Sequence, residues 1–355
     1  MTRPSAPLAR RLASLSRTIR VALARSLTTS LRATSIRATS LLATSLLTLA
    51  CADAATTTDA PAPVDPAAEA AALARPVDHA DSRTQQARAR VDALLAEPSP
   101  RTLLAVLAQS HASARALLGP HRLHYTAGFS LAPEAPSRPV VDQPVQLEQK
   151  VNDELTLVLG SAVGEPLRLH LSQKTDKDEG REIIILDETV HTRLAHRGWQ
   201  TRALDSELHN VWLDEAQHCV HDLVELAAPA LAVAVQESGD KVEVTLRRAD
   251  AVDPALIAAG TGREWRQRSE LGEITGSITL DRATGLWRTA EVAVAYVVRD
   301  VLDRPQRGNS TLRASFEPAA AADLVIEAPS VAAPAPERTR PELERQRLLH
   351  GLAGT

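Results

Sequence analysis

The most regular feature of the chain is a period of two in its apolar residues, which runs from about Leu123 to Glu317. Side chains that alternate in this way lie on opposite faces of a β-strand, so one face can be buried and the other solvated. The connections between these segments are short and polar, as at Asn152-Asp153 and Arg282–Gly285, which favours antiparallel neighbours because a parallel pair needs a long crossover. The segments expected to be strands are Leu123–Leu131, Val145–Val151, Glu154–Leu159, Leu167–Gln173, Glu182–Leu186, Thr189–Leu194, Ala230–Gln236, Lys241–Arg248, Glu273–Asp281, Leu286–Val298 and Ser310–Glu317.

Three segments carry helix boundary signals and are expected to be helices: residues 84–97, 100–118 and 205–228. Each is closed by a proline or a Gly-Pro pair, and Ser99 and Asp205 are good N-cap residues. The third helix is inserted into the strands and should lay its apolar face over the sheet, and a shorter helix is expected at Asp253–Ala259. The sequence therefore predicts a single α+β domain over residues 82–328, built on one large antiparallel sheet with two N-terminal helices.

The N-terminus predicts an export signal. Eight arginines precede the first acidic residue, Asp53, and an apolar segment from Ala38 to Ala50 follows them. This order of charged, apolar and small residues is typical of a secretory signal peptide over residues 1–50. The apolar segment is shorter than the ~20 residues that a spanning helix needs. A mitochondrial transit peptide and twin-arginine export at Arg10-Arg11 are the alternatives.

The end of this leader, Leu47-Thr48-Leu49-Ala50-Cys51, resembles the lipobox of bacterial lipoproteins. The resemblance implies cleavage before Cys51, diacylglycerol on its thiol and attachment to a membrane, and several acyl chains give stable anchoring. Ala52 is not the aspartate that retains some lipoproteins at the inner membrane, which favours a periplasm-facing anchor in the outer membrane. Residues 51–81 are expected to be the lipidated cysteine and a flexible tether, and residues 329–355 a Pro/Ala linker with a mixed-charge tail.

Net charge argues against nucleic acid as a partner. Cleavage before Cys51 leaves 32 of the 40 basic residues against 44 acidic ones, so the formal charge changes from -4 to -12. A chain this acidic is repelled by phosphate backbones.

Candidate catalytic chemistry is sparse. His218, Cys219 and His221 are metal-ligand types, but at about 100° per residue no single ion can contact all three on a straight helix. A metal-dependent enzyme that uses the two histidines is the third and weakest hypothesis, and Cys219 is expected to be a small buried hydrophobe. Residues 175–182 match half of a calcium loop, although a charged hairpin turn is the simpler interpretation. With no catalytic motif in the sequence, we expect no enzyme, no metal and no cofactor.

The order of leader, helices and strands, together with the late hairpin Gly276–Val298 ("GSITLDRATGLWRTAEVAVAYVV"), resembles the bacterial lipoprotein carriers of the LolA and LolB group and the LppX-like lipid-binding lipoproteins. The resemblance implies a curved half-barrel sheet of about 10–11 strands under a lid of helices, with an apolar cavity between them for acyl chains. The residues expected to line that cavity are Leu147, Leu157, Leu169, Ile183, Ile185, Trp212, Leu223, Val292, Val294 and Tyr296.

Two functions are therefore expected for an envelope lipoprotein of this kind. In the first, the protein binds or transfers lipid or acylated ligands without covalent catalysis. In the second, the same apolar residues fill a solid core, and the protein is a structural or interaction module of the envelope.

Overall fold

The computed structural model describes residues 77–134, 146–204, 206–259, 263–300, 302–319 and 324–335. The leader, Cys51, most of the tether and the charged tail lie outside these residues, so their predicted roles stay predictions. Among the described helices, none is both long and apolar enough to cross a membrane.

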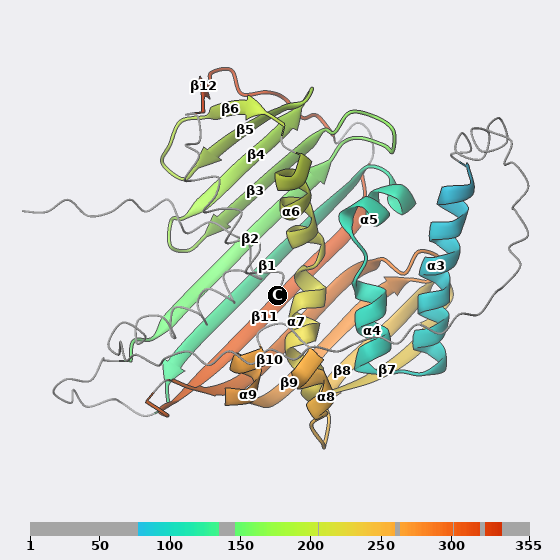
Figure 1. The fold of residues 1–355 in the computed structure, drawn as a ribbon, viewed down its shortest axis with the longest axis vertical. Helices are drawn as coiled ribbons and strands as arrows, with labels where there is room; N and C mark the ends of the chain where they lie inside the picture. The colour runs from blue at the N-terminus through green and yellow to red at the C-terminus, as the bar shows by residue number, and fades with distance from the viewer. Residues whose placement is uncertain are drawn as a thin grey trace, which may run out of the picture.

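One open, curved sheet of twelve strands forms the body of the protein (Figure 1). Its spatial order is β12-β6-β5-β4-β3-β2-β1-β11-β10-β9-β8-β7, and every neighbouring pair is antiparallel except β12 with β6. The strands are β1 (His121–Pro133), β2 (Gln149–Leu159), β3 (Leu169–Thr175), β4 (Gly180–Leu186), β5 (Thr189–Leu194), β6 (Gln200–Ala203), β7 (Leu231–Ser238), β8 (Lys241–Arg248), β9 (Ser269–Asp281), β10 (Trp287–Arg299), β11 (Pro305–Pro318) and β12 (Ala333–Pro334).

Helices α4 to α7 lie across one face of this sheet, and α3 stands beside them (Figure 1). The helical elements are α3 (Val77–Ala96), α4 (Pro100–Leu107), α5 (His111–Leu118), α6 (Ser206–Gln217), α7 (Cys219–Ala227), the 3-10 turn η1 (Ala228–Ala230), α8 (Pro254–Ala259) and α9 (Arg263–Arg268). The predicted α+β class, with a large curved sheet under helices, is confirmed.

The core lies between the helices and the inner face of the sheet. Burial alternates along the strands as the sequence period predicts: in β8, Val242, Val244 and Leu246 are buried, whereas Glu243 and Thr245 are exposed. The buried residues form one contiguous apolar cluster that extends across the whole sheet. The outer face is therefore polar and the inner face dry, as expected for an antiparallel sheet covered on one side.

One predicted turn is wrong. Asn152-Asp153 was expected to separate two strands, but both residues lie within the single strand β2, opposite Gly128 and Ala127 of β1. Ladder pairing with β1 keeps the chain extended here and overrides the turn propensity of the two residues. The preceding residues 146–148 are not strand, and Leu147 is 70% exposed.

Two predicted helices are each divided in two. The helix expected over residues 100–118 ends at Leu107 and restarts at His111, because the Ser110 side chain accepts a hydrogen bond from the Ser113 N–H and so caps a new helix. The helix expected over 205–228 is interrupted at His218, whose backbone (φ -87°, ψ 7°) is not helical. A uniform apolar stripe cannot reveal such breaks, since the stripe continues across them.

Three elements were not predicted: β6, β12 and α9. The described part of the expected linker is also not free of the domain, because Ala333 and Pro334 pair with Gln200 and Thr201. These elements are short, and two-residue or four-residue strands give too little sequence pattern to be recognised.

Candidate functional site

The predicted lining residues lie inside the common core. Leu157, Leu169, Ile183, Ile185, Leu223, Val292, Val294 and Tyr296 are all buried in the one contiguous cluster. Trp212 is partly buried against it, with the Arg202 guanidinium 5.9 Å from its ring centre, and only Leu147 lies elsewhere. Gly308 is required opposite Tyr296, because the tyrosine ring occupies the space that a Cβ would fill. The structure thus brings together nearly all of the residues that the resemblance implies, in a densely packed interior.

A group of polar residues interrupts this apolar interior beneath α6, and we call it the polar cluster: Tyr125 of β1, Asp153 of β2, Gln173 of β3, Arg181 of β4 and Glu215 of α6. The exposed fractions of Tyr125, Asp153, Gln173 and Arg181 are 0%, 3%, 7% and 7%. Each of these four residues stands at an inward position of its strand, where most other residues of the sheet are apolar. Buried polar groups at such positions are costly unless they are well paired.

Hydrogen bonds join the members only in part. Gln173 Nε2 donates to Asp153 Oδ2 at 2.6 Å, and Arg181 Nε donates to Gln173 Oε1 at 2.8 Å. Arg181 Nη2 and Glu215 Oε2 are 3.6 Å apart, which makes an ion pair but is too long for a good hydrogen bond. The sheet and α6 are thus connected through a single stretched ion pair at this point.

The electrostatics of the polar cluster are strongly perturbed by burial. Burial raises the pKa of Asp153 to about 6, although the hydrogen bond from Gln173 and the Arg181 charge act in the opposite direction. Burial also raises the pKa of Tyr125, and the Asp153 carboxylate raises it further. Tyr125 therefore stays a neutral hydroxyl, while Asp153 can gain or lose a proton near neutral pH.

The two halves of the inserted helix are held in different ways (Figure 1). Helix α7 packs on β10 and β11 and buries an apolar face that includes Val220, Leu223 and Val224. Helix α6 contacts mainly α5 and α7, and of its described side chains the buried apolar ones are Leu213 and Ala216.

The remaining attachment of α6 is polar. Asp214 Oδ1 accepts one hydrogen bond from the backbone N–H of His111 at 2.9 Å, and it also contacts the ring nitrogen Nδ1 of His111 at 2.8 Å. Burial alone would raise the pKa of Asp214, but the two contacts to His111 outweigh it and the pKa is lowered. Helix α6, which the interruption at His218 separates from α7, is therefore held both by two buried apolar side chains and by these polar contacts.

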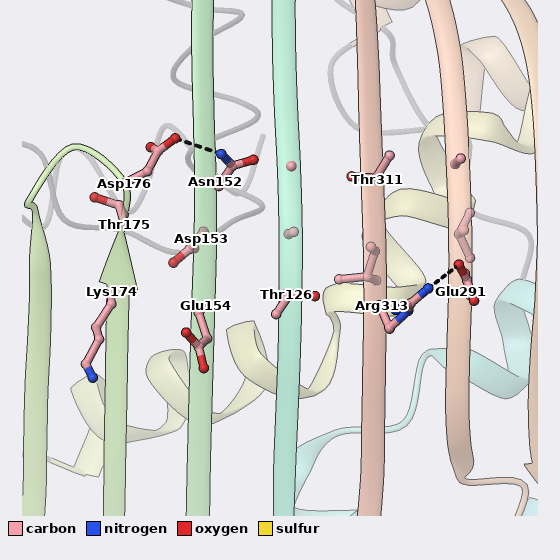
Figure 2. Close-up of a pocket in the computed structure, with 15 residues that line it drawn as sticks. Thr126, Asn152, Asp153, Glu154, Lys174, Thr175, Asp176, Glu291, Thr311 and Arg313 are labelled. Atoms are coloured by element: carbon pink, nitrogen blue, oxygen red, sulfur yellow. Dashed lines mark hydrogen bonds and ion pairs between the residues drawn. The ribbon is translucent and has the colours of Figure 1, made fainter.

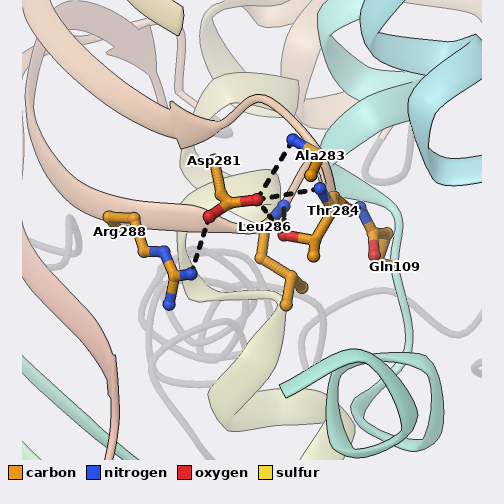
Figure 3. A network of polar contacts seen from close by, with 6 residues as sticks. All are labelled: Gln109, Asp281, Ala283, Thr284, Leu286 and Arg288. Atoms are coloured by element: carbon orange, nitrogen blue, oxygen red, sulfur yellow. Dashed lines mark hydrogen bonds and ion pairs between the residues drawn. The ribbon is translucent and has the colours of Figure 1, made fainter. Parts of the chain in front are cut away.

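The helix interruptions are fixed by a second polar network (Figure 3). Gln109 lies between α4 and α5, and its side-chain Nε2 donates to the Thr284 backbone carbonyl at 3.0 Å. The backbone carbonyl oxygen of Gln109 contacts His218 Nε2 at 3.1 Å. In the same turn, Asp281 accepts hydrogen bonds from Thr284 and from Arg288 Nη2 at 2.7 Å. The hairpin of β9 and β10 is therefore linked to both helix breaks through Gln109.

The candidate metal ligands do not converge. The rings of His218 and His221 have centroids 5.7 Å apart, but His221 Nδ1 faces Asp222 at 3.3 Å, while His218 faces Gln109. Within the described ranges, no group of three or more histidine, cysteine, aspartate or glutamate residues could hold a metal ion. Cys219 is a free, buried thiol on the apolar face of α7, and burial raises its pKa.

The half calcium loop is a charged hairpin. Asp176 accepts a hydrogen bond from Asn152 Nδ2 at 2.8 Å, and Asp178, at φ 58°, pairs with His196 at 2.9 Å.

The outer face of the sheet has a shallow hollow of about 590 Å³ (Figure 2). Its floor is Thr126 and Gly128 of β1, with Lys174 and Glu154 on one side and Arg313, paired with Glu291 at 2.7 Å, on the other. The hollow is open, polar and of mixed charge. Such a face is usual for a solvated antiparallel sheet.

The polar cluster is the part of the candidate site that the sequence did not predict. Asp153 was assigned to a turn, and Arg181 lies just outside the expected strand that begins at Glu182. The sequence signal that could have revealed the polar cluster is the two-residue period of apolar positions. Gln173 and Arg181 occupy positions that should be apolar if Leu171 and Ile183 face inward. Only the pairing of the four strands shows that these positions meet.

Comparison with known proteins adds no family assignment. No protein-family model matches the chain. No curated protein matches it either.

Proposed function

We propose that this protein is a membrane-anchored lipoprotein of the cell envelope that binds or transfers lipid or acylated ligands between its sheet and helix α6. The observation that carries the proposal is the unequal attachment of the inserted helix. Helix α7 buries six residues on its apolar face, whereas α6 buries only Leu213 and Ala216 among its described apolar side chains and is otherwise connected to β4 and α5 by polar contacts. A segment held in this way is suited to open without unfolding the core.

The proposed mechanism of ligand uptake depends on the interruption between α6 and α7 at His218. Rotation of α6 about His218 separates Glu215 from Arg181 and uncovers inward residues of the neighbouring strands, such as Leu157 and Ile183. An acyl chain that enters between α6 and this surface gains about 0.8 kcal/mol for each methylene group that it buries. No covalent step is needed, and Cys51 would hold the domain near the membrane through a tether of roughly 30 residues that spans about 30 Å.

Native mass spectrometry of the chain from Ala52 to Thr355 tests the proposal, after incubation with phospholipid vesicles. We expect lipid adducts that dissociate on collisional activation. Ile183→Trp adds bulk to the inner face and should reduce the adducts roughly tenfold, because overpacking an interior costs about 1–3 kcal/mol. Leu186→Trp is the matched control, since this residue of the same strand stands at an outward and partly exposed position.

A second candidate function is favoured by one observation, the continuous burial of the predicted lining residues. In that case the interior is a permanent core, and the protein is a structural or interaction module of the envelope. The same experiment separates the two: a domain that takes up no lipid while remaining folded overturns the binding proposal and supports the second.

A further inference from the structure

The polar cluster has an excess of unsatisfied groups. Nine buried side-chain nitrogen or oxygen atoms of the described residues lack a hydrogen-bond partner, and four of them belong to this cluster: Tyr125 Oη, Asp153 Oδ1, Arg181 Nη2 and Glu215 Oε2. Natural proteins leave few buried polar atoms unpaired, so four in one place require an explanation. An absent ligand is one such explanation.

The chemistry of these atoms defines what could satisfy them. Asp153 Oδ1 and Glu215 Oε2 can only accept hydrogen bonds while ionised, Arg181 Nη2 can only donate, and the Tyr125 hydroxyl can do either. The complementary group must therefore present N–H or O–H donors to the two carboxylates and an acceptor oxygen to the guanidinium.

The formal charge of the polar cluster further restricts the class of ligand that could bind there. With Asp153 and Glu215 ionised and Arg181 protonated, the polar cluster carries a formal charge of -1. A carboxylate or a phosphate alone would increase this excess in a buried site, which is unfavourable. A quaternary ammonium group would balance the charge but has no N–H to donate.

We propose that the polar cluster recognises a primary ammonium group with an adjacent acceptor oxygen, as in the phosphoethanolamine headgroup of a phospholipid. The ammonium lies between Asp153 and Glu215, and a phosphate oxygen accepts from Arg181 and from the Tyr125 hydroxyl. This inference rests on the proposed function, because the headgroup enters the polar cluster when α6 opens, and Glu215 contacts the ammonium after α6 closes over it. Tyr125, Asp153 and Arg181 stay on the sheet during that opening, so three of the four groups are held in place by β1, β2 and β4.

A competition among headgroups tests the inference. The chain from Ala52 to Thr355 is incubated with vesicles that contain equal amounts of dioleoyl phosphatidylethanolamine, phosphatidylcholine and phosphatidylglycerol, and the recovered lipids are quantified by mass spectrometry. We expect phosphatidylethanolamine to be enriched about tenfold, the size of effect given by one hydrogen bond to a charged group. Asp153→Asn and Glu215→Gln should each lose the enrichment but still carry lipid.

Four further measurements test whether the enrichment of phosphatidylethanolamine depends on the polar cluster. Glu291→Gln, on the outer face, is the matched control and should keep the enrichment, and thermal unfolding shows whether each variant is folded. The enrichment should also weaken at pH 5 relative to pH 7.5, because Asp153, which lies near Gln173, Tyr125 and the Arg181 that pairs with Glu215, is then protonated. Free O-phosphoethanolamine, titrated by calorimetry, separates a headgroup site from a lipid site.

Each outcome has one meaning. Equal recovery of the three lipids, or enrichment that survives Asp153→Asn, overturns the headgroup inference and leaves the proposed function standing; in that case the four atoms are satisfied by water. Binding of free O-phosphoethanolamine without any lipid uptake supports the headgroup site and overturns the proposed function. If neither the lipid nor the free headgroup binds, both are wrong.

Discussion

Asp153 is the residue at which stability and function are most clearly opposed. Its inward position on β2 would suit an apolar side chain, as at Leu155 and Leu157 of the same strand. The carboxylate lies in the interior, where Gln173 donates to Oδ2, the Glu154 backbone N–H also stabilises the carboxylate, and Oδ1 has no hydrogen-bond partner. Residues that break a local rule in this way are most often found at functional sites.

The raised pKa of Asp153 makes a prediction about stability and pH. The folded protein holds this proton until about pH 6, whereas the unfolded chain releases it near 3.8. Between these values the folded state binds more protons, so the Asp153 contribution to the free energy of unfolding falls as pH rises, by roughly 3 kcal/mol in total. Asp153→Asn should therefore stabilise the protein relative to wild type at pH 7.5 but much less at pH 4.

Urea unfolding at pH 4, 5, 6 and 7.5 measures this difference. The comparison between the two proteins is needed because Asp214 and Asp281, whose pKa values are lowered, contribute stability that is lost as pH falls. Free energies for wild type and variant that differ by the same amount at every pH would contradict the prediction.

At the scale of elements, the attachment of α6 is the feature on which the proposed mechanism depends. Asp214 connects α6 to the first turn of α5 through two contacts to His111. The adjacent α7 has no part in this connection, and it is held by its own apolar face. The two helices should therefore respond differently to loss of the Asp214 side chain.

Asp214→Ala should release α6 alone. We expect amide hydrogen exchange over residues 206–217 to become roughly tenfold faster, because hydrogen bonds to a charged group contribute about 1.5–3 kcal/mol. Exchange over residues 219–227 should not change. Mass spectrometry of peptides from the two segments checks this, with Asp303→Ala, at an exposed turn, as the control. Equal acceleration in both helices would mean that they open as one unit, contrary to the mechanism.

At the scale of the whole molecule, the sheet has two dissimilar faces. One is covered by helices and is mainly apolar, with the polar cluster, Gln306 and Ser310 among its buried polar residues. The other is open and carries charged and hydroxyl side chains around the hollow in Figure 2. A domain with a solvated outer face and a dry interior can hold an apolar ligand while it remains in water. Its access to a membrane would then depend on the anchor at Cys51.

The anchor gives a whole-molecule prediction. In bacterial cells that express the full chain, Cys51→Ala should abolish incorporation of radiolabelled palmitate, since no other residue would receive the diacylglycerol. Cys219→Ala is the control and should keep the label, because that thiol is buried on α7. Labelling that persists in Cys51→Ala would contradict the lipoprotein interpretation.

Much of the fold could be predicted from local pattern. The alternation in β8 and β10 and the apolar stripe of α7 are properties of single segments, and each segment has the structure that its own period predicts. Most residues that the resemblance implies as a cavity lining are also buried, as Leu157, Ile183 and Val292 show. Patterns of this kind are reliable because burial of one face is a requirement on each strand or helix separately.

What the sequence by itself determined is therefore the class of the protein: a large sheet with one apolar face, covered by amphipathic helices. Only the tertiary structure decided where the helices break, because Gln109 and His218 are fixed by contacts with each other and with Thr284, far along the chain. It alone also brought Asp153, Arg181 and Glu215 together. That placement depends on pairing among four strands and the position of α6, and such long-range registers have no signature within any one segment.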